Sequence, residues 1–333
     1  MSASITSVAL HNPALARIVD LLEAVDERRP DLLRVLTYHR VVEKDEETSF
    51  SPGISVSLPV FQQHAAYLSR HYHVLHIKDL LEASQAGTGL PPRSVLITFD
   101  DAYQDFARLA WPVLRRHDLP VTLFVPTAFP DHPERVFWWD WLSQAFHLTE
   151  RRDTLVTPFG SFPLSDTSQR RSAYKRVRDT IKSLPHNQVY DSVEQVCCQL
   201  GVPPAGAPIL GWDDLRELAR QGVCLGAHTQ THPLMNQISL EEARQEISGS
   251  FNDLMRETGS TLPIFAYPGG ELNDAAARLL QEAGVELGFT TRRGLNDLRS
   301  MDRLRISRIN IGQRTSLSVL RAQLLARSRA FYR

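Results

Sequence analysis

The sequence predicts an α/β fold in which parallel strands are joined by helices, with one mostly helical insertion. Two observations predict this fold. Short apolar, β-prone runs alternate with segments whose apolar residues recur at helical spacing, as expected for parallel strands with crossover helices. The alternation stops near residue 131 and resumes near residue 209, and the stretch between them has a different, more polar pattern.

The first part of the chain supplies four expected strands and four expected helices. An amphipathic helix over 13–25 precedes a buried strand over 32–38, which ends at Tyr38-His39. The run 94–99, Ser-Val-Leu-Ile-Thr-Phe, is strongly β-prone and ends at two aspartates. The remaining expected elements are helices over 58–70, 78–84 and 106–117, and strands over 74–75 and 121–125.

The middle of the chain, residues 131–208, is expected to be a helical insertion. It begins with an aromatic cluster that contains Trp138, Trp139 and Trp141, and it ends in a Gly/Pro-rich linker over 201–208. The tryptophans are open to two interpretations: packing of the insertion, or a platform on which a sugar stacks. A helix is expected over 168–183 because the spacing there is helical.

Strands and helices alternate again after the linker. Gly222 and Gly284 lie just past two of the expected helices, where glycine commonly ends a helix. The expected helices are 212–221, 240–258, 274–283 and 317–328, and the expected strands are 223–227, 264–267, 287–291 and 305–311.

Composition limits the classes of function. The 333 residues are 42% hydrophobic, enough for a large core, and their formal net charge of −1 argues against a nucleic-acid binder. Adjacent Cys197 and Cys198, with Cys224, do not suggest a disulfide framework. The first 20 residues lack a signal-peptide pattern, and no apolar run is long enough for a transmembrane segment. We therefore expect a cytoplasmic protein, with attachment to the membrane surface left open; the sequence does not predict its oligomeric state.

Three polar groups follow expected strands: Asp100-Asp101, the pair His228 and His232, and His39. Sites in parallel α/β folds assemble at this edge. Two neighbouring carboxylates repel unless a cation or proton lies between them, although an aspartate here could also cap a helix. Histidines four residues apart can bind one metal ion, and two histidines with one aspartate leave positions for water and substrate.

These motifs resemble those of the polysaccharide deacetylase family, the NodB-homology or family 4 carbohydrate esterases. Residues 98–101, Thr-Phe-Asp-Asp, are similar to its first motif, and residues 228–232, His-Thr-Gln-Thr-His, to its second. Residues 265–270, Phe-Ala-Tyr-Pro-Gly-Gly, resemble the third. The similarity extends from about residue 35 to residue 311 and omits the insertion.

The resemblance implies a distorted (β/α) barrel of about seven parallel strands. It implies a single domain over 1–333, with the barrel core in 30–130 and 209–315 and the helical insertion in 131–208. We expect this domain to bind a carbohydrate substrate.

The resemblance also implies roles for individual residues. Asp100 would be the general base, and Asp101, His228 and His232 would hold a divalent metal ion, with Zn²⁺ expected first and Co²⁺ or another divalent ion as the alternative. The ion would polarise the acyl carbonyl and activate the attacking water. The backbone amide of Gly269 would stabilise the oxyanion. Three further residues are expected to contact substrate: Tyr267, Pro268 and Arg308.

Two family residues have no counterpart at the matching positions. Ala266 stands where many members carry an arginine that orients the catalytic aspartate, and the C-terminal histidine that acts as general acid elsewhere is absent. His39 lies in a Tyr-His-x-Val motif similar to that of the exopolysaccharide deacetylase branch and is the expected acid; a structural histidine is the alternative. Arg308 could orient Asp100 in place of the missing arginine.

The expected activity is the metal-dependent removal of N-acetyl groups from an amino-sugar glycan or its precursor. Two alternatives remain open. The domain could be a catalytically inactive carbohydrate-binding module, or the enzyme could remove a different acyl group, such as a formyl group or an ester.

Overall fold

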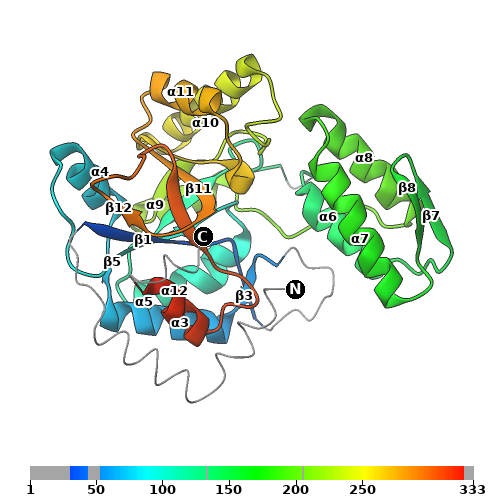
Figure 1. Ribbon diagram of the computed structural model, residues 1–333, viewed down its shortest axis with the longest axis horizontal. Helices are drawn as coiled ribbons and strands as arrows, with labels where there is room; N and C mark the ends of the chain where they lie inside the picture. Colours follow the sequence, from blue (N-terminus) through cyan, green and yellow to red (C-terminus); the bar gives the residue numbers. More distant parts are fainter. Residues whose placement is uncertain (1–30, 44–52, 133, 205, 326–333) are drawn as a thin grey trace.

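The computed structural model describes residues 31–43, 53–132, 134–204 and 206–325, and its centre is a closed barrel of seven parallel strands (Figure 1). The strand order is β1-β13-β11-β10-β9-β6-β5, and β5 pairs with β1 to close the barrel. This confirms the predicted fold class. The expected helix over 13–25 lies outside the described residues. The seven strands are β1 (Leu32–Tyr38), β5 (Ser94–Phe99), β6 (Thr122–Val125), β9 (Cys224–Ala227), β10 (Ile264–Ala266), β11 (Leu287–Arg293) and β13 (Ile306–Asn310).

Closure depends on the pairing of the two longest apolar runs. Residues 34–38 of β1 pair in parallel with residues 95–99 of β5, with Leu36 opposite Ile97. Both strands are buried along their whole length, as expected where helices cover the outside of a barrel and side chains fill its inside. Two short strands extend the sheet: β12 (Asn296–Asp297) pairs antiparallel with β1, and β4 (His73–Val74) pairs parallel with β5.

Strand alternation decides which residues face the barrel interior. Alternate residues from the strands form one buried cluster that includes Val35, Leu96, Phe289 and Ile306. Because side chains on a strand alternate between faces, the residues two and four positions further along point the same way. Thr98 and Asp100 continue the row of Leu96, and Arg308 continues the row of Ile306. The barrel interior is therefore apolar at one end and polar at the carboxyl end.

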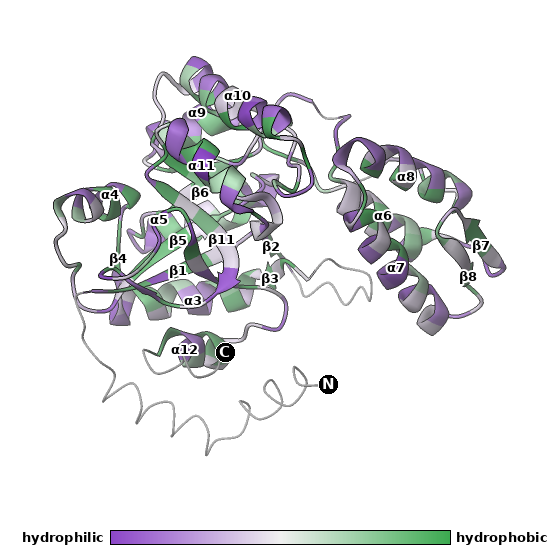
Figure 2. Ribbon diagram, turned by 45° about the horizontal axis from the view of Figure 1, so that its top comes forward, coloured by the Kyte–Doolittle hydropathy of each residue, from purple (hydrophilic) through white to green (hydrophobic). Residues whose placement is uncertain are grey.

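Helices surround the barrel, and most of the predicted ones are present (Figures 1 and 2). Helix α10 begins with a capping box between Ser239 and Glu242 and ends at Gly259 in a left-handed conformation, which explains why its bounds could be predicted. The described helices of the barrel are α3 (Leu58–His71), α4 (Ile77–Ala86), α5 (Trp111–Arg116), α9 (Trp212–Arg220), α10 (Leu240–Thr258), α11 (Asp274–Glu282) and α12 (Leu317–Leu324).

The helix expected over 106–117 is not regular. It begins as a π-helical turn, Phe106–Ala110, and becomes α-helical only at Trp111. Pro112 has no amide hydrogen to donate to the preceding turn, so the regular pattern is interrupted there.

The insertion projects from the carboxyl end of the barrel and has its own hydrophobic core (Figure 1). It contains α6 (Trp138–Leu148), α7 (Thr167–Lys182) and α8 (His186–Gln199), as the expected helical character requires. It also contains a hairpin of β7 (Thr154–Thr157) and β8 (Gly160–Pro163), which the sequence analysis did not predict. The buried face of α7 packs into this core through Ala173, Tyr174, Val177 and Ile181.

A second small sheet lies next to the barrel mouth, where β2 (Arg40–Val42) pairs in parallel with β3 (Ser55–Ser57). Within the described ranges, none of the helices combines the length and apolar character needed to cross a bilayer.

Candidate active site

One cavity of about 330 Å³ at the carboxyl end of the barrel contains most of the predicted site residues. Asp100 and Asp101 reach it from the end of β5, His228 from the end of β9, and His39 from the residue after β1. The backbone amide of Asp100 donates to the carbonyl of Tyr38 at 3.0 Å, which continues the β1–β5 pairing to the site. Six predicted residues line this cavity: His39, Asp100, Asp101, His228, His232 and Gly269.

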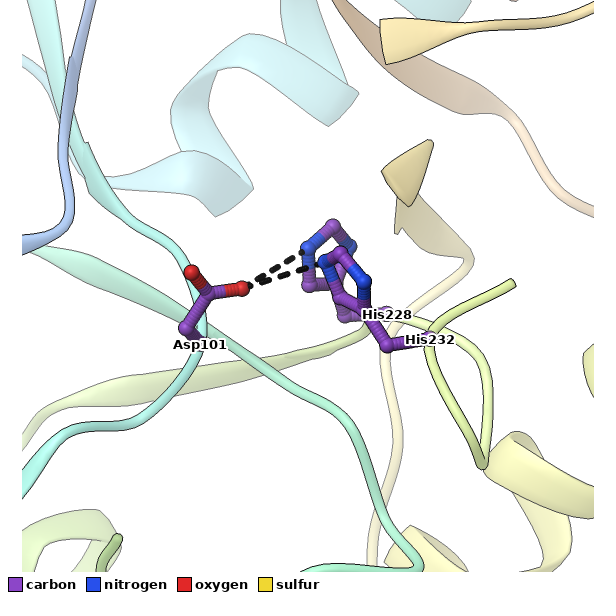
Figure 3. A group of neighbouring side chains, drawn as sticks. All are labelled: Asp101, His228 and His232. Carbon is purple, nitrogen blue, oxygen red and sulfur yellow. Dashed lines mark ion pairs between the residues drawn. The ribbon is translucent and has the colours of Figure 1, made fainter. Parts of the chain in front are cut away.

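Asp101, His228 and His232 converge on one point (Figure 3). Oδ1 of Asp101 lies 3.4 Å from Nε2 of His228 and 3.3 Å from Nε2 of His232. Two ligands held about 2.0–2.1 Å from a tetrahedral Zn²⁺ ion are about 3.3 Å apart, so these separations suit a shared ion. Oδ1 of Asp101 is buried and makes no hydrogen bond to any described residue. The three residues therefore fit a divalent cation.

The two aspartates do not cap a helix. The next helical segment begins at Phe106, after Asp105, and Asp105 uses its carboxylate to accept hydrogen bonds from Arg40 and the amide of Val41. Asp101 itself has φ of +73°, a left-handed conformation that non-glycine residues rarely adopt. This turn brings Asp101 into the same cavity as Asp100, although adjacent strand residues would point to opposite faces.

The loop over 228–232, which carries both histidines, has a similarly strained backbone. Thr229 has φ of +63° and His232 has φ of +62°. Such strain is found at sites where the surrounding structure fixes the backbone. Here Glu246 of α10 accepts hydrogen bonds from the amides of Gln230 at 2.7 Å and Thr231 at 2.9 Å. A helix outside the barrel thus fixes the loop that carries both histidines.

The orientation of His228 is set by a hydrogen bond behind it. Its Nδ1 lies 2.7 Å from the carbonyl oxygen of Ala266, so Nδ1 donates and Nε2 is left with its lone pair directed at the shared point. Ala266, which stands where the family arginine was expected, therefore contributes through its backbone.

Arg308 lies against Asp100. Its Nη1 donates to Oδ1 of Asp100 at 2.9 Å and its Nη2 to Oδ2 at 2.7 Å, while Nε donates to the carbonyl of Thr290 at 2.7 Å. The guanidinium is fully buried and, unlike Asp100, does not line the cavity. We therefore replace the expectation that Arg308 binds substrate: its guanidinium is bonded to Asp100 and Thr290 outside the cavity, and its contact with Asp100 matches the alternative, orienting role.

Burial and charge act in opposite directions on the two aspartates. Burial alone would raise the pKa of both carboxyl groups. The positive charge of Arg308 outweighs burial at Asp100 and brings its pKa below the ordinary value. The nearby imidazoles of His228 and His232 outweigh burial at Asp101 and bring its pKa well below the ordinary value. Both side chains are therefore carboxylates at neutral pH.

Comparison with known proteins agrees with the geometry. A sequence model of the family described as polysaccharide deacetylase matches residues 88–288, more than half of the chain. This chain belongs to the polysaccharide deacetylase family. The matched stretch includes Asp100, Asp101, His228 and His232, whereas His39 and Arg308 lie outside it.

Individual relatives are distant. YxkH of Bacillus subtilis (strain 168) is 20% identical over 276 residues, covering 81% of this chain and 68% of that protein. The poly-beta-1,6-N-acetyl-D-glucosamine N-deacetylase of Staphylococcus epidermidis is 32% identical over 102 residues, only 28% of this chain and 35% of that enzyme. The solved structure of Streptococcus pyogenes deacetylase PplD in complex with acetate superposes with a TM-score of 0.60 at 19% identity, covering 88% of this chain and 98% of that one. This likeness supports the deacetylase fold.

His39 lies near Asp100 in the cavity that also contains Asp101, His228 and His232. Its Nε2 is 3.9 Å from Oδ2 of Asp100, too far for a hydrogen bond. Its Nδ1 is buried without a hydrogen-bond partner among the described residues, and its side chain is 18% exposed to the cavity. Among the described residues, no backbone group bonds to His39 Nδ1, as the alternative of a structural histidine would require.

Gly269 is the residue of the third family motif that lines the cavity. Tyr267 and Pro268 are buried, and the Tyr267 hydroxyl donates to the carbonyl of Leu304 at 2.8 Å. Their expected contact with substrate is therefore not supported, because these side chains pack into the protein. Gly269 is exposed at the cavity with φ of +61°, and a Cβ there would lie 2.8 Å from a methyl of Leu234. Glycine suits this turn, because it adopts a positive φ without strain and leaves room for Leu234.

The tryptophans divide between the two interpretations. Trp141 is buried in the core of the insertion, and its indole donates to the carbonyl of Val202 at 3.2 Å. Trp138 and Trp139 line the cavity. The Trp139 ring stacks on Phe137, and its centroid lies 4.8 Å from that of the His232 ring.

Sequence analysis did not identify Tyr103 and Asp140, which connect the insertion to the site. Trp139 Nε1 donates to the Tyr103 hydroxyl at 3.0 Å, and that hydroxyl donates to Oδ2 of Asp140 at 2.9 Å. Both residues are buried, and burial raises the pKa of Asp140 to about 7. A polar pair inside an aromatic cluster has no periodic signal, so pattern alone could not identify it.

Proposed function

We propose that this chain is a metal-dependent N-deacetylase that acts on an N-acetylglucosamine-containing glycan or glycan precursor. The observation that carries the proposal is that two adjacent aspartates in one cavity have different partners. Asp101 is directed at two histidines, whereas Asp100 is held by Arg308. The name of the Staphylococcus epidermidis relative supports an amino-sugar substrate, although the match covers only part of each chain.

Each residue would have a distinct part in the reaction. A divalent ion held by Asp101, His228 and His232 supplies Lewis acidity, which polarises the acyl carbonyl and favours ionisation of water. The Asp100 carboxylate accepts a proton from the attacking water. The Gly269 amide, which lies at the cavity, donates a hydrogen bond to the developing oxyanion. His39 then donates a proton to the nitrogen as the C–N bond breaks, so that acetate and a free amine leave.

The function is tested by measuring acetate release from N-acetylglucosamine oligomers. We expect release that stops when a chelator removes the metal and returns when Zn²⁺ or Co²⁺ is added, because the triad fits one divalent ion. Formate release from N-formyl sugars and hydrolysis of O-acetyl sugars, measured in parallel, would point to the alternative acyl groups. Metal-loaded protein that binds oligosaccharides without hydrolysing any of these substrates would show an inactive binding module and contradict the proposal.

Replacing His39 with Ala is expected to lower kcat for amide substrates by about 10²-fold, the usual contribution of a positioned general acid. KM should change much less, because binding does not require the proton. An aryl acetate provides an internal control, since its phenolate leaves without protonation and should be hydrolysed at nearly the normal rate. His73→Ala, which removes an exposed histidine from β4, is the matched control. If kcat fell equally for the amide and the aryl ester, His39 would have a structural role.

A further inference from the structure

A second, larger cavity adjoins the catalytic cavity. Its volume is about 880 Å³, within the range of cavities that hold drug-sized ligands. The two cavities share four lining residues: His39, Ile54, Gly269 and Thr291. A substrate whose acetamide group lies between Asp100 and His39 can therefore extend into the second cavity.

The second cavity, which we call the cationic cavity, is lined by four positive side chains. Arg171 and Lys175 come from α7 of the insertion, whereas Arg293 comes from the end of β11 and Arg314 from the loop before α12. No acidic side chain lines it among the described residues. The whole chain has 37 basic and 38 acidic residues, so composition does not explain this local excess.

Three of the four cations that line this cavity lack an ion-pair partner among the described residues. Lys175, Arg293 and Arg314 form no ion pair with any residue that the structure describes. Some other arginines on the surface do form ion pairs, for example Arg216 with Glu257 at 2.8 Å. Like charges around one cavity repel each other, and a cleft with one sign of charge attracts counter-ions. An anionic ligand would remove this repulsion.

The cations of α7 continue towards the catalytic cavity. Arg171, Lys175, Arg178 and Lys182 recur at intervals that place them on one face of the helix, and the last two line the catalytic cavity. Arg178 is paired with Asp179 at 2.6 Å, whereas Lys182 forms no ion pair within the described ranges. The opposite face of α7 is buried in the insertion (Figures 1 and 2). The insertion therefore presents a line of positive charge to the barrel mouth.

We propose that the substrate is an anionic glycan, in which the acetylated amino sugar is attached to a group bearing phosphate or carboxylate that binds in the cationic cavity. Guanidinium groups match the paired oxygens of either anion and bind both by charge-assisted hydrogen bonds. This inference rests on the proposed deacetylase function, and it assigns the insertion a part in substrate selection.

The test compares charged and neutral substrates of equal length with the full-length, Zn²⁺-loaded enzyme. A hyaluronan tetrasaccharide, which carries carboxylates, is compared with chitotetraose, and N-acetylglucosamine 1-phosphate is compared with N-acetylglucosamine. We expect kcat/KM for one anionic member to exceed that of its neutral counterpart about tenfold, because a charge-assisted hydrogen bond contributes roughly that factor. The pair of substrates that shows the preference identifies the anion. Added salt should weaken this preference. Equal values within both pairs overturn the inference.

Single variants localise the preference. Arg293→Gln and Arg314→Gln should each reduce the ratio of anionic to neutral kcat/KM several-fold, because each removes one positive charge from the cationic cavity. Arg116→Gln is the matched control: Arg116 is exposed on α5 and does not line either cavity, so the ratio should stay the same. If Arg293→Gln and Arg314→Gln leave the ratio unchanged, the anion does not bind here and the inference is wrong.

Failure of the proposed function would give a different result. Acetate release from neutral oligomers without preference for charge would retain the deacetylase function and overturn this inference. If no substrate released acetate, calorimetric binding of the same tetrasaccharides would decide: salt-sensitive binding of the hyaluronan fragment, lost in Arg293→Gln, would support the cationic site although the deacetylase function had failed. Equal binding of both tetrasaccharides would overturn it.

Discussion

Asp100→Asn is expected to lower kcat for acetate release by about 10³-fold, within the range for loss of a general base. Asparagine has nearly the same size and can still accept a hydrogen bond from Arg308, but it cannot accept a proton from water. The metal ligands are untouched, so Co²⁺ or Zn²⁺ should bind with the normal stoichiometry. Steady-state kinetics and metal titration of the same preparation measure both quantities.

Asp101→Asn is the matched comparison, since it makes the same substitution at the adjacent residue. We expect this variant to lose metal affinity by at least about 10–100-fold, the loss typical even of residues that support a ligand. Raising the metal concentration should restore part of its activity, whereas it should not restore Asp100→Asn. If both variants lost metal equally, or if Asp100→Asn kept normal turnover, the separation of base and ligand would be wrong.

The barrel was predictable because its strands are buried on both faces. Runs such as the one over 94–99 contain almost only apolar and β-branched residues, and they alternate with amphipathic helices. Sequence could not predict which strands are neighbours. The contact between β1 and β5 closes the barrel across more than 50 residues, and it depends on packing of the entire interior rather than on a local pattern.

The site was predictable where a motif lies at the end of a strand, and not where side-chain direction matters. His39, Asp100 and His228 follow strands whose carboxyl ends meet at one edge, so the sequence indicated that they would lie close together. Arg308 and Tyr267 follow the same logic in sequence, yet neither side chain lines the catalytic cavity. Arg308 belongs to the inward row of β13, and that row is known only once the register of the strand is known.

The cationic face of α7 shows a further limit of prediction from the sequence. A helix was predicted over 168–183 from its helical spacing, close to the observed α7, but the same charged residues would be expected on any solvated helix. The charges of α7 indicate a ligand site only together with Arg293 and Arg314 of the barrel, which line the same cavity and are more than 100 residues away in sequence. A charge pattern becomes evidence for a ligand only when the fold brings two such surfaces together.

Arg308→Met is expected to lower the free energy of unfolding by about 3–5 kcal/mol at neutral pH, because it leaves the buried Asp100 carboxylate without its cationic partner. Methionine keeps the apolar stem and much of the volume, so the loss reflects charge more than packing. Urea unfolding should be measured on chelated protein, since a bound metal ion would add its own binding free energy to the folded state.

The pH dependence identifies the group responsible for this loss. In the wild type, Arg308 brings the pKa of Asp100 below its ordinary value, so the pair stabilises the fold above the unfolded pKa of about 3.9 and less as pH falls towards the folded pKa. Without Arg308, burial raises that pKa, and Asp100 can take up a proton as pH falls. The difference in stability between wild type and Arg308→Met should therefore be largest near pH 7 and become smaller in mild acid.

A double-mutant cycle completes the argument. Asp100→Asn removes the charge that Arg308 neutralises, so the double variant Asp100→Asn/Arg308→Met should be more stable near neutral pH than Arg308→Met alone, with a coupling energy of about 0.5–3 kcal/mol between the two positions. Glu241→Gln with Arg244→Met is a control at the protein surface, where both partners are exposed and the coupling should be much weaker. Additive losses at positions 100 and 308 would mean that Arg308 stabilises the barrel through packing and its bond to Thr290. Strong coupling would mean that the negative charge required of the base is maintained by a residue of β13, which is separated from β5 in the barrel by β1 alone.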